Sequence, residues 1–307
     1  MPDHQPYDCL IVGAGPAGLV AGIYLRRFHR RICIVDAGAS RALRIPKTHN
    51  YPGFPDGVVG VELLQRLREQ LDGCGGAVEP RRIEQLQAPG EDGCFVARSA
   101  GRDIRSRTVL LATGVEDIEP ELQGIEAVRG RGLLRYCPIC DGTEFTGRRI
   151  GVLGSGAHGV REAVFIRNYS AEVSLLCLSP QDEPDEAGRR QLRENQVKLA
   201  CGPFAKVADT IEGAATVFAA DGGAFAFDVL YAALGTRVRA ELAAQVGAAR
   251  DAAGCLTVDR HQCTSVAGLY AAGDVVSSLD QLVVAGGQAA IAASAIHNSL
   301  PAGRPAD

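Results

Sequence analysis

One glycine motif occurs twice in this chain, and it restricts the fold more than any other feature. The pattern Gly-x-Gly-x-x-Gly runs from Gly13 to Gly18 and again from Gly154 to Gly159. Each copy follows a short apolar run and precedes a segment with helical character, which is the context in which this motif binds dinucleotides. The two copies predict an α/β protein with two Rossmann-like, three-layer nucleotide-binding domains.

The segments around each copy repeat the same strand, turn, helix and strand order. The first copy lies between strands predicted at residues 9–12 and 31–36, and the second lies between strands predicted at residues 150–153 and 172–178. A helix is expected after each turn, and the second helix is expected over residues 160–169. The chain therefore contains one structural unit twice.

The glycines of the first motif have separate roles. Gly13 allows a tight turn, Gly15 lets the backbone approach a pyrophosphate, and Gly18 lets the helix pack closely on the strand. The pyrophosphate then lies at the helix N-terminus, where free N–H groups favour negative charge, and Pro16 suits the first helical turn. The residues predicted to bind the dinucleotide at this first motif are Gly13, Gly15, Pro16, Ala17, Gly18 and Asp36.

The two motifs differ at the position that binds the ribose of a dinucleotide. Asp36 follows Gly15 by 21 residues, where a carboxylate accepts ribose hydroxyls, but the same offset from Gly156 gives Cys177. The residues after Cys177 are neutral and then acidic, with no Arg or Lys near by for a 2′-phosphate. Two interpretations stay open for Gly154, Gly156 and Gly159: a nicotinamide-nucleotide site, or a Rossmann-like unit that no longer binds a nucleotide.

Later segments suggest how the domains are connected. A short strand ends in Gly273-Asp274, where a carboxylate or a backbone amide can hold a ribityl chain and phosphate, and a helix with small residues is expected over residues 281–296. A strand predicted at residues 108–111 ends in Ala112-Thr113-Gly114, and the matching return lies near residues 234–236. We predict a discontinuous outer domain (residues 1–115 and 238–307) and an inserted middle domain (residues 116–237).

Cys137 and Cys140 are the only close cysteine pair in the sequence. Two cysteines three residues apart at a helix start can close a small disulfide, and the adjacent Asp141 can exchange a proton when a thiol leaves. Half of a zinc site and a pair of inert buried thiols are the alternatives, although no second Cys-x-x-Cys or Cys/His pair completes four zinc ligands. No metal is therefore expected, and the other eight cysteines are predicted to be small buried hydrophobes.

Charge and hydropathy exclude other classes of function. The net charge is -4 and the pI about 5.9, which gives no electrostatic reason to bind nucleic acid or an anionic membrane. The most apolar late stretch, residues 283–296, is too short for a membrane span, which needs about 20 apolar residues. The first residues lack the basic start and apolar core of a signal peptide, so a cytoplasmic location is expected.

Taken together, these features resemble the low-molecular-weight thioredoxin reductase family of FAD-linked disulfide oxidoreductases. A Cys-x-x-Cys-Asp-Gly sequence in the middle domain is specific to this branch, whereas glutathione- and lipoamide-type relatives carry their pair near the N-terminus. The resemblance covers almost the whole chain, in order: Gly13 to Gly18, Asn50-Tyr51-Pro52-Gly53, Ala112-Thr113-Gly114, Cys137 to Gly142, Gly154 to Gly159, Gly273-Asp274 and Gln288-Ala289-Ala290.

The resemblance implies an FAD-binding outer domain and an NAD(P)-binding-like middle domain that carries the cysteine pair. It implies an enzyme that passes electrons between FAD and this pair. Cys140 would face the flavin, Cys137 would exchange with a substrate disulfide, and Asp141 would be the acid–base group. A thioredoxin-like protein or a small disulfide or dithiol would be the partner, and the subunits would form a homodimer. Cofactor-binding positions implied in addition are Ala37, Asn50, Thr113, Gly114, Gly273, Asp274, Gln288 and Ala289.

This sequence departs from the family pattern at the second nucleotide site. NADPH-dependent members have a His-Arg-Arg-type run where this chain has Cys177-Leu178-Ser179, and Arg161-Glu162 stands where they carry two glutamates. Efficient NADPH dependence is therefore not expected, and NADH, ferredoxin or a dithiol remain as electron donors. The alternatives are an oxygen-using oxidase of small dithiols, a redox-sensing flavoprotein without turnover, and a flavin monooxygenase-like enzyme, for which a dithiol has no use.

Overall fold

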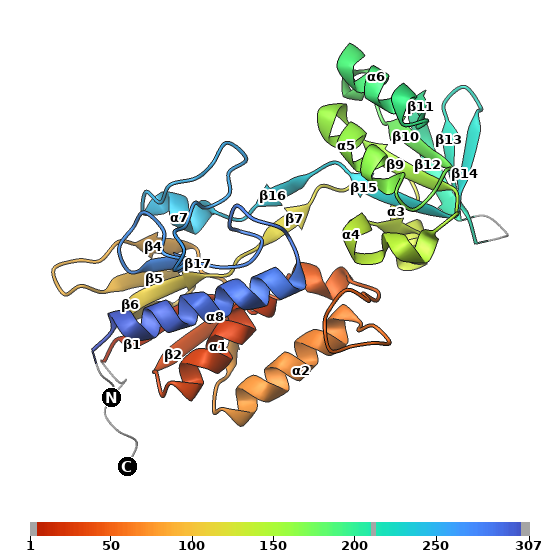
Figure 1. The fold of residues 1–307 in the computed structure, drawn as a ribbon. Coiled ribbons are helices and arrows are strands. Elements are labelled where there is room, and N and C mark those ends of the chain that lie inside the picture. Colours follow the sequence, from red (N-terminus) through yellow and green to blue (C-terminus); the bar gives the residue numbers. More distant parts are fainter. Residues whose placement is uncertain (1–4, 210–212, 302–307) are drawn as a thin grey trace. The chain divides into compact units, whose positions relative to one another are not determined.

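The computed structural model describes residues 5–209 and 213–301, and the chain divides into two compact units (Figure 1). Unit 1 contains residues 1–47, 51–116 and 238–307, and unit 2 contains residues 48–50 and 117–237. The chain passes between the units in β7 (Val115–Asp117) and β16 (Thr236–Val238), which pair as a two-stranded sheet. The predicted domains did not include the assignment of residues 48–50 to unit 2.

Unit 1 is built on a seven-stranded sheet in the order β3-β2-β1-β6-β5-β4, with β17 paired to β6. Its first half is parallel and Rossmann-like, whereas β4, β5 and β6 pair antiparallel. The strands are β1 (Tyr7–Val12), β2 (Ile32–Asp36), β3 (Val78–Pro80), β4 (Gln85–Gln87), β5 (Phe95–Ser99), β6 (Arg102–Leu111) and β17 (Leu269–Ala271).

Both faces of this sheet are buried, because successive side chains of a strand point to opposite faces. Cys9 and Ile11 of β1 join one apolar cluster, and Leu10 and Val12 join another. The first cluster also holds α1 and α8, which lie side by side (Figure 1). The helices of unit 1 are α1 (Pro16–Arg27), α2 (Gly60–Gly73), α7 (Glu241–Gln245) and α8 (Leu282–Ser299), and a 3₁₀ helix covers Arg41–Arg44.

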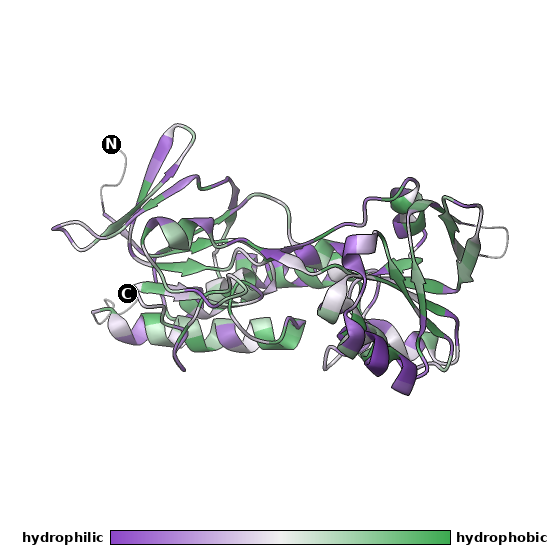
Figure 2. Ribbon diagram, turned by 90° about the horizontal axis from the view of Figure 1, so that it is seen from above, coloured by the Kyte–Doolittle hydropathy of each residue, from purple (hydrophilic) through white to green (hydrophobic). Residues whose placement is uncertain are grey.

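Unit 2 repeats the parallel Rossmann arrangement in a five-stranded sheet ordered β11-β10-β9-β15-β8. As in unit 1, the central strands are mainly hydrophobic (Figure 2). The strands of this sheet are β8 (Leu134–Arg135), β9 (Ile150–Gly154), β10 (Val173–Cys177), β11 (Lys198–Cys201) and β15 (Val229–Ala233).

An antiparallel meander and four helices complete unit 2. The meander consists of β12 (Phe204–Asp209), β13 (Ala215–Ala219) and β14 (Ala224–Phe227). The helices are α3 (Ile125–Gly130), α4 (Pro138–Asp141), α5 (Gly156–Ile166) and α6 (Glu186–Glu194), with 3₁₀ helices at Gly142–Phe145 and Pro180–Asp182. The helix after the second glycine motif begins at Gly156, earlier than predicted, because the motif itself forms its first turn.

The third glycine of each motif has no space for a side chain. A Cβ atom on Gly18 would lie 1.8 Å from the carbonyl oxygen of Gly13, and one on Gly159 would lie 2.8 Å from the carbonyl carbon of Gly154. Each helix therefore packs directly on the turn that precedes it, as the motif requires. The predicted fold, with two Rossmann-like units and the second inserted in the first, is confirmed.

The prediction that all eight remaining cysteines are buried is wrong for half of them. Cys9, Cys33, Cys94 and Cys177 are buried, but Cys74, Cys255 and Cys263 are only partly buried. Cys201 is exposed because it ends β11, at an edge of the sheet of unit 2. All eight are free thiols.

Candidate active site

The two cysteines of the Cys-x-x-Cys sequence are joined in a disulfide. Cys137 precedes the first residue of α4 and Cys140 lies within this short helix, which brings their Cα atoms to 5.3 Å. This separation is normal for a disulfide. The backbone N–H of Cys140 donates to the carbonyl of Cys137 at 3.0 Å. Both residues are half-buried, whereas Ile139 between them is 45% exposed.

Asp141, the next residue, is buried. Its carboxylate oxygens have different partners: the Tyr231 hydroxyl donates to Oδ1 at 2.7 Å, and Nη1 of Arg135 lies 3.6 Å from Oδ2. Burial raises the pKa of Asp141 above its ordinary value, the Tyr231 hydrogen bond and the Arg135 charge oppose that rise, and the nearby charge of Glu144 adds to it. The carboxyl at the end of α4, the cysteine helix, is thus held by the sheet of unit 2 and has a raised pKa.

Arg135 and Tyr231 were not among the site residues predicted from the sequence. Tyr231 is 90 residues from Asp141 in the sequence and lies in an apolar strand, so no local pattern marks it. Tyr231 and Arg135 become neighbours only through the parallel pairing of β15 with β8, in which they are register partners.

The first glycine motif forms a cradle at the N-terminus of α1. Gly13 has φ +105°, in the left-handed region, and a Cβ atom there would lie 2.3 Å from the carbonyl oxygen of Ala112. No side chain caps the first turn of α1, so its N–H groups stay available for phosphate oxygens. The Asp36 carboxylate is anchored at the end of β2, where Oδ1 accepts from the Ala14 N–H at 3.2 Å. These residues fit the pyrophosphate and one ribose of FAD.

A second part of the predicted FAD site is assembled by Gln288. Its Oε1 accepts from the Gly273 N–H at 2.8 Å and its Nε2 donates to Ser278 at 2.9 Å, which fixes the loop after β17. Asp274 in this loop pairs with Nη1 of Arg41 at 3.2 Å. Ala289, in contrast, is fully buried in the apolar cluster around α1 and α8.

The other predicted cofactor residues lie in different settings. The Thr113 hydroxyl donates to the Arg239 carbonyl at 2.6 Å, and Gly114 has φ +66°. Ala37 is exposed directly after β2. Asn50 belongs to unit 2, where its Nδ2 donates to the carbonyl of Ile139 at 3.2 Å. In this structure Asn50 therefore supports the cysteine helix.

The second glycine motif is followed by a strand end whose side chains are already engaged. Cys177 is fully buried opposite Cys201, and burial raises the pKa of its thiol to about 12. Farther along, Ser179 donates to the Asp182 carboxylate at 2.7 Å. Arg189 forms an ion pair with Glu183. The polar and charged side chains after this strand therefore form hydrogen bonds and ion pairs with one another.

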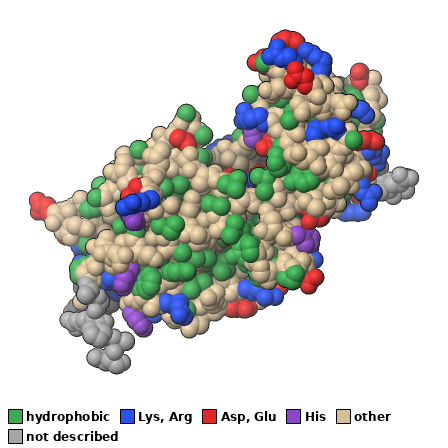
Figure 3. Space-filling view, in the orientation of Figure 1, with side chains coloured by type: hydrophobic (Ala, Val, Ile, Leu, Met, Phe, Trp, Pro, Cys, Tyr) green, Lys and Arg blue, Asp and Glu red, His purple; other side chains and the backbone are tan. Residues whose placement is uncertain are grey.

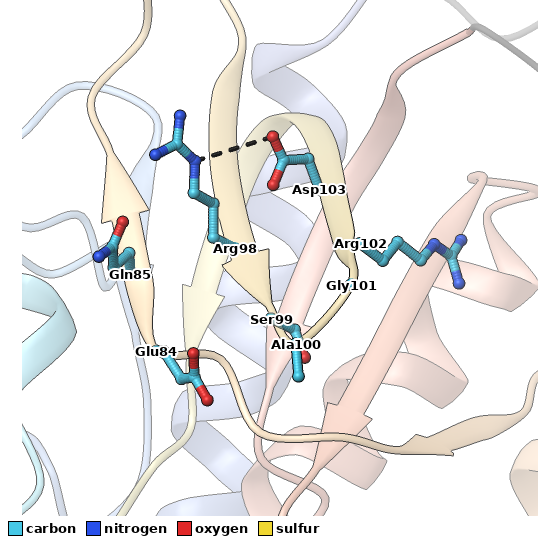
Figure 4. A pocket seen from close by; sticks show the side chains of 8 residues that line it. All are labelled: Glu84, Gln85, Arg98, Ser99, Ala100, Gly101, Arg102 and Asp103. Carbon is cyan, nitrogen blue, oxygen red and sulfur yellow. Dashed lines mark ion pairs between the residues drawn. The ribbon is translucent and has the colours of Figure 1, made fainter.

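A shallow pocket elsewhere in unit 1 is lined by residues of β4, β5 and β6 (Figure 4). Its two arginines are both paired with acids. Nε of Arg98 lies 3.7 Å from Asp103, and Nη1 of Arg102 lies 2.9 Å from Glu79. This pocket contains none of the predicted site residues.

Within residues 5–209 and 213–301, no group of three His, Cys, Asp or Glu side chains is arranged so that it could hold a metal ion. No helix in these ranges is long and apolar enough to span a membrane.

Comparison with known proteins gives consistent results. The family described as pyridine nucleotide-disulphide oxidoreductase matches residues 7–289. Thioredoxin reductase of Listeria innocua is 27% identical over 308 residues, which cover 94% of this chain and 92% of the relative. Thioredoxin reductase of Aquifex aeolicus is 29% identical over 310 residues, covering 96% and 93%. The crystal structure of HlmI has a TM-score of 0.87 at 29% identity and covers 97% of this chain and 93% of its own.

The Asp36 carboxylate is predicted to accept the ribose hydroxyls of FAD. The Asp36→Ala variant would lose this acceptor, and each charge-assisted hydrogen bond contributes about 1.5–3 kcal/mol. We expect FAD to bind at least about tenfold more weakly, because about 1.4 kcal/mol corresponds to a factor of ten. The flavin-to-protein ratio after dialysis and the dissociation constant measure this. The control Asp103→Ala removes an acid exposed elsewhere in unit 1, and equal flavin retention by the two variants would contradict the prediction.

Proposed function

Because the chain belongs to the pyridine nucleotide-disulphide oxidoreductase family, and within it to the low-molecular-weight thioredoxin reductase-like branch, we propose that it is a thiol–disulfide oxidoreductase. It transfers electrons between FAD and the Cys137–Cys140 disulfide, and on to a thioredoxin-like protein or a small disulfide. The observation that carries this proposal is the disulfide itself, followed directly by a buried carboxyl at Asp141. Thioredoxin as the substrate is supported by the names of the relatives.

The chemistry of the chain's own residues is thiol–disulfide exchange. FAD, when bound, supplies a two-electron carrier that can reduce the disulfide. In the reduced pair, the thiolate of Cys137 attacks a substrate disulfide and releases one substrate sulfur. The thiolate of Cys140 then breaks the mixed disulfide, which restores the Cys137–Cys140 bond and releases the second substrate sulfur. Asp141 transfers the protons that these steps require.

Serine variants test this proposal. Cys137→Ser and Cys140→Ser each remove one sulfur of the exchanging pair, so the reduced protein should pass no electrons to oxidised thioredoxin above background. Transfer is measured after complete reduction and removal of excess reductant, by alkylation and mass spectrometry of thioredoxin. Cys201→Ser, which removes an exposed free thiol, serves as the control and should retain full transfer. Full transfer by both variants of the pair would refute the mechanism.

We also propose that NADPH is a poor electron donor. A 2′-phosphate brings close to two negative charges, and good sites meet it with arginine in a bidentate geometry. Here Cys177 stands where a ribose ligand is expected, and Arg189 already pairs with Glu183. The acids Asp182, Glu183, Asp185 and Glu186 follow and would repel the phosphate. NADH avoids that repulsion but finds no ribose carboxylate, so dithiols or a donor that acts directly on the flavin are favoured.

An anaerobic titration followed by flavin absorbance tests the choice of donor. We expect dithiothreitol to reduce the flavin more readily than NADPH or NADH. Glu183→Gln leaves Arg189 without its anionic partner, so this variant should accept NADPH better while its response to NADH stays unchanged. Fast, stoichiometric reduction of the unmodified protein by micromolar NADPH would show that the donor proposal is wrong.

A homodimer is the third part of the proposal. Figure 3 shows hydrophobic side chains gathered on the face of unit 1 that includes α1 and α8. On α8, Val283, Gly287 and Ile291 form an exposed stripe with a spacing of four residues, in which Val283 is 51% and Ile291 44% exposed. Tyr24 of α1 is 40% exposed. Apolar patches of this kind mark protein interfaces, and we assign this one to a second copy of the chain.

Sedimentation or light scattering checks the dimer. The unmodified protein should have the mass of two chains, and the Val283→Glu/Ile291→Glu double variant should have the mass of one, because four charges would face one another across the interface. Phe165→Glu, which changes an exposed apolar residue of unit 2, is the control and should stay dimeric. A monomeric unmodified protein at micromolar concentration would exclude this interface.

A cytoplasmic location belongs to the same proposal. Eight free thiols, one of them exposed, suit a reducing compartment, because exposed thiols are readily oxidised elsewhere.

A further inference from the structure

Three elements of unit 2 converge on one carboxyl group. Asp141 ends α4, Arg135 ends β8, and Tyr231 lies in the middle of β15. Because β8 and β15 are parallel neighbours in which Tyr231 and Arg135 are register partners, the two side chains emerge next to each other on the sheet. The Tyr231 hydroxyl donates a hydrogen bond to Oδ1 at 2.7 Å, and Nη1 of Arg135 forms an ion pair with Oδ2 at 3.6 Å. The sheet therefore determines how the Asp141 carboxyl is oriented.

The aromatic ring of Phe145 packs against both Tyr231 and Arg135. It meets the Tyr231 ring edge-on, with 6.3 Å between the centroids, and the Arg135 guanidinium lies over it at 5.5 Å. Tyr231 is 1% exposed, so its hydroxyl has little freedom to turn towards water. Phe145 ends the 3₁₀ helix that follows Asp141, so the segment carrying the carboxyl also supplies the surface against which the donors pack.

We propose that Tyr231 and Arg135 are positioning residues for thiol–disulfide exchange, which fix the orientation of the Asp141 carboxyl that accepts a thiol proton. This inference rests on the proposed function, in which Asp141 transfers protons. The carboxylate takes the proton of the resolving Cys140 thiol, the sulfur of Cys140 breaks the mixed disulfide, and the resulting carboxylic acid returns the proton to the departing substrate sulfur. One S–S bond forms as another breaks, and no external oxidant or reductant is needed.

The charges around Asp141 determine the direction of the pH effect. Burial and the charge of Glu144 favour the protonated form, whereas Tyr231 and Arg135 favour the anion. Glu144 is in turn paired with Nδ1 of His49 at 2.5 Å. Loss of the Tyr231 hydroxyl therefore raises the pKa of Asp141 further. In that variant, the rate of exchange should reach its plateau at higher pH than in the unmodified protein.

The experiment compares two substrates that differ in their need for a proton. Reduced holoenzyme is mixed with an alkyl disulfide, bis(2-hydroxyethyl) disulfide, or with an aryl disulfide, 5,5′-dithiobis(2-nitrobenzoate). An aryl thiolate is a good leaving group without protonation, whereas an alkyl thiolate gains from a proton donor. We expect Tyr231→Phe to slow both reactions, because both need the Asp141 carboxylate to take the Cys140 proton. The alkyl reaction should slow by about tenfold more than the aryl one at neutral pH, a modest part of what proton transfer contributes.

Further variants separate the possible outcomes. Tyr136→Phe is the matched control, because the Tyr136 hydroxyl donates to Glu119 at 2.6 Å and not to Asp141. Arg135→Lys keeps the charge but loses the guanidinium's reach. It should also slow the alkyl reaction more than the aryl one, and it provides the test if Tyr231→Phe does not fold. Equal slowing of both substrates, or of neither, would overturn the positioning role. If Asp141→Asn also leaves the alkyl reaction unchanged, the proposed role of Asp141 fails instead.

Discussion

The absence of a side chain at two glycines is the constraint on which both units of this protein depend. Gly18 lies against the backbone of Gly13, and Gly159 lies against that of Gly154, at distances that exclude a Cβ atom. Only this contact lets each helix begin directly above the turn that follows its strand. The uncapped N–H groups of α1 then point out of the end of the sheet, next to the carboxylate that ends β2.

The sequence was sufficient for the parts of the fold whose signals are local. Turns that need glycine, apolar strands before them and a cysteine pair three residues apart all lie within short segments, so the Rossmann units and the disulfide were predictable. The meander of β12, β13 and β14 was not, because its strands are short and only partly buried. The exposure of Cys201 depends on its place at the end of an edge strand, which single-sequence patterns do not reveal.

The candidate site shows the same division. Cys137, Cys140 and Asp141 are consecutive or nearly so, but Tyr231 and Arg135 reach Asp141 only because β15 pairs with β8. A tyrosine in an apolar strand looks like an ordinary core residue, and its hydroxyl acquires a purpose only from a neighbouring strand. Asn50 is a comparable case: it donates a hydrogen bond to Ile139 in the cysteine helix, 89 residues away, which no local pattern predicted, and its implied cofactor contact stays a prediction.

The insertion of one unit in the other has a consequence for synthesis on the ribosome. Unit 2 is almost continuous in sequence, so its sheet can close as soon as β15 has emerged. Unit 1 cannot, because the cluster around α1 is completed by α8, and β17 must still pair with β6. The apolar surface of α1 therefore stays uncovered until α8 is synthesised, more than 250 residues later. During that interval the nascent chain carries a finished second unit and an unfinished first one, and exposed surface of this kind is what chaperones bind.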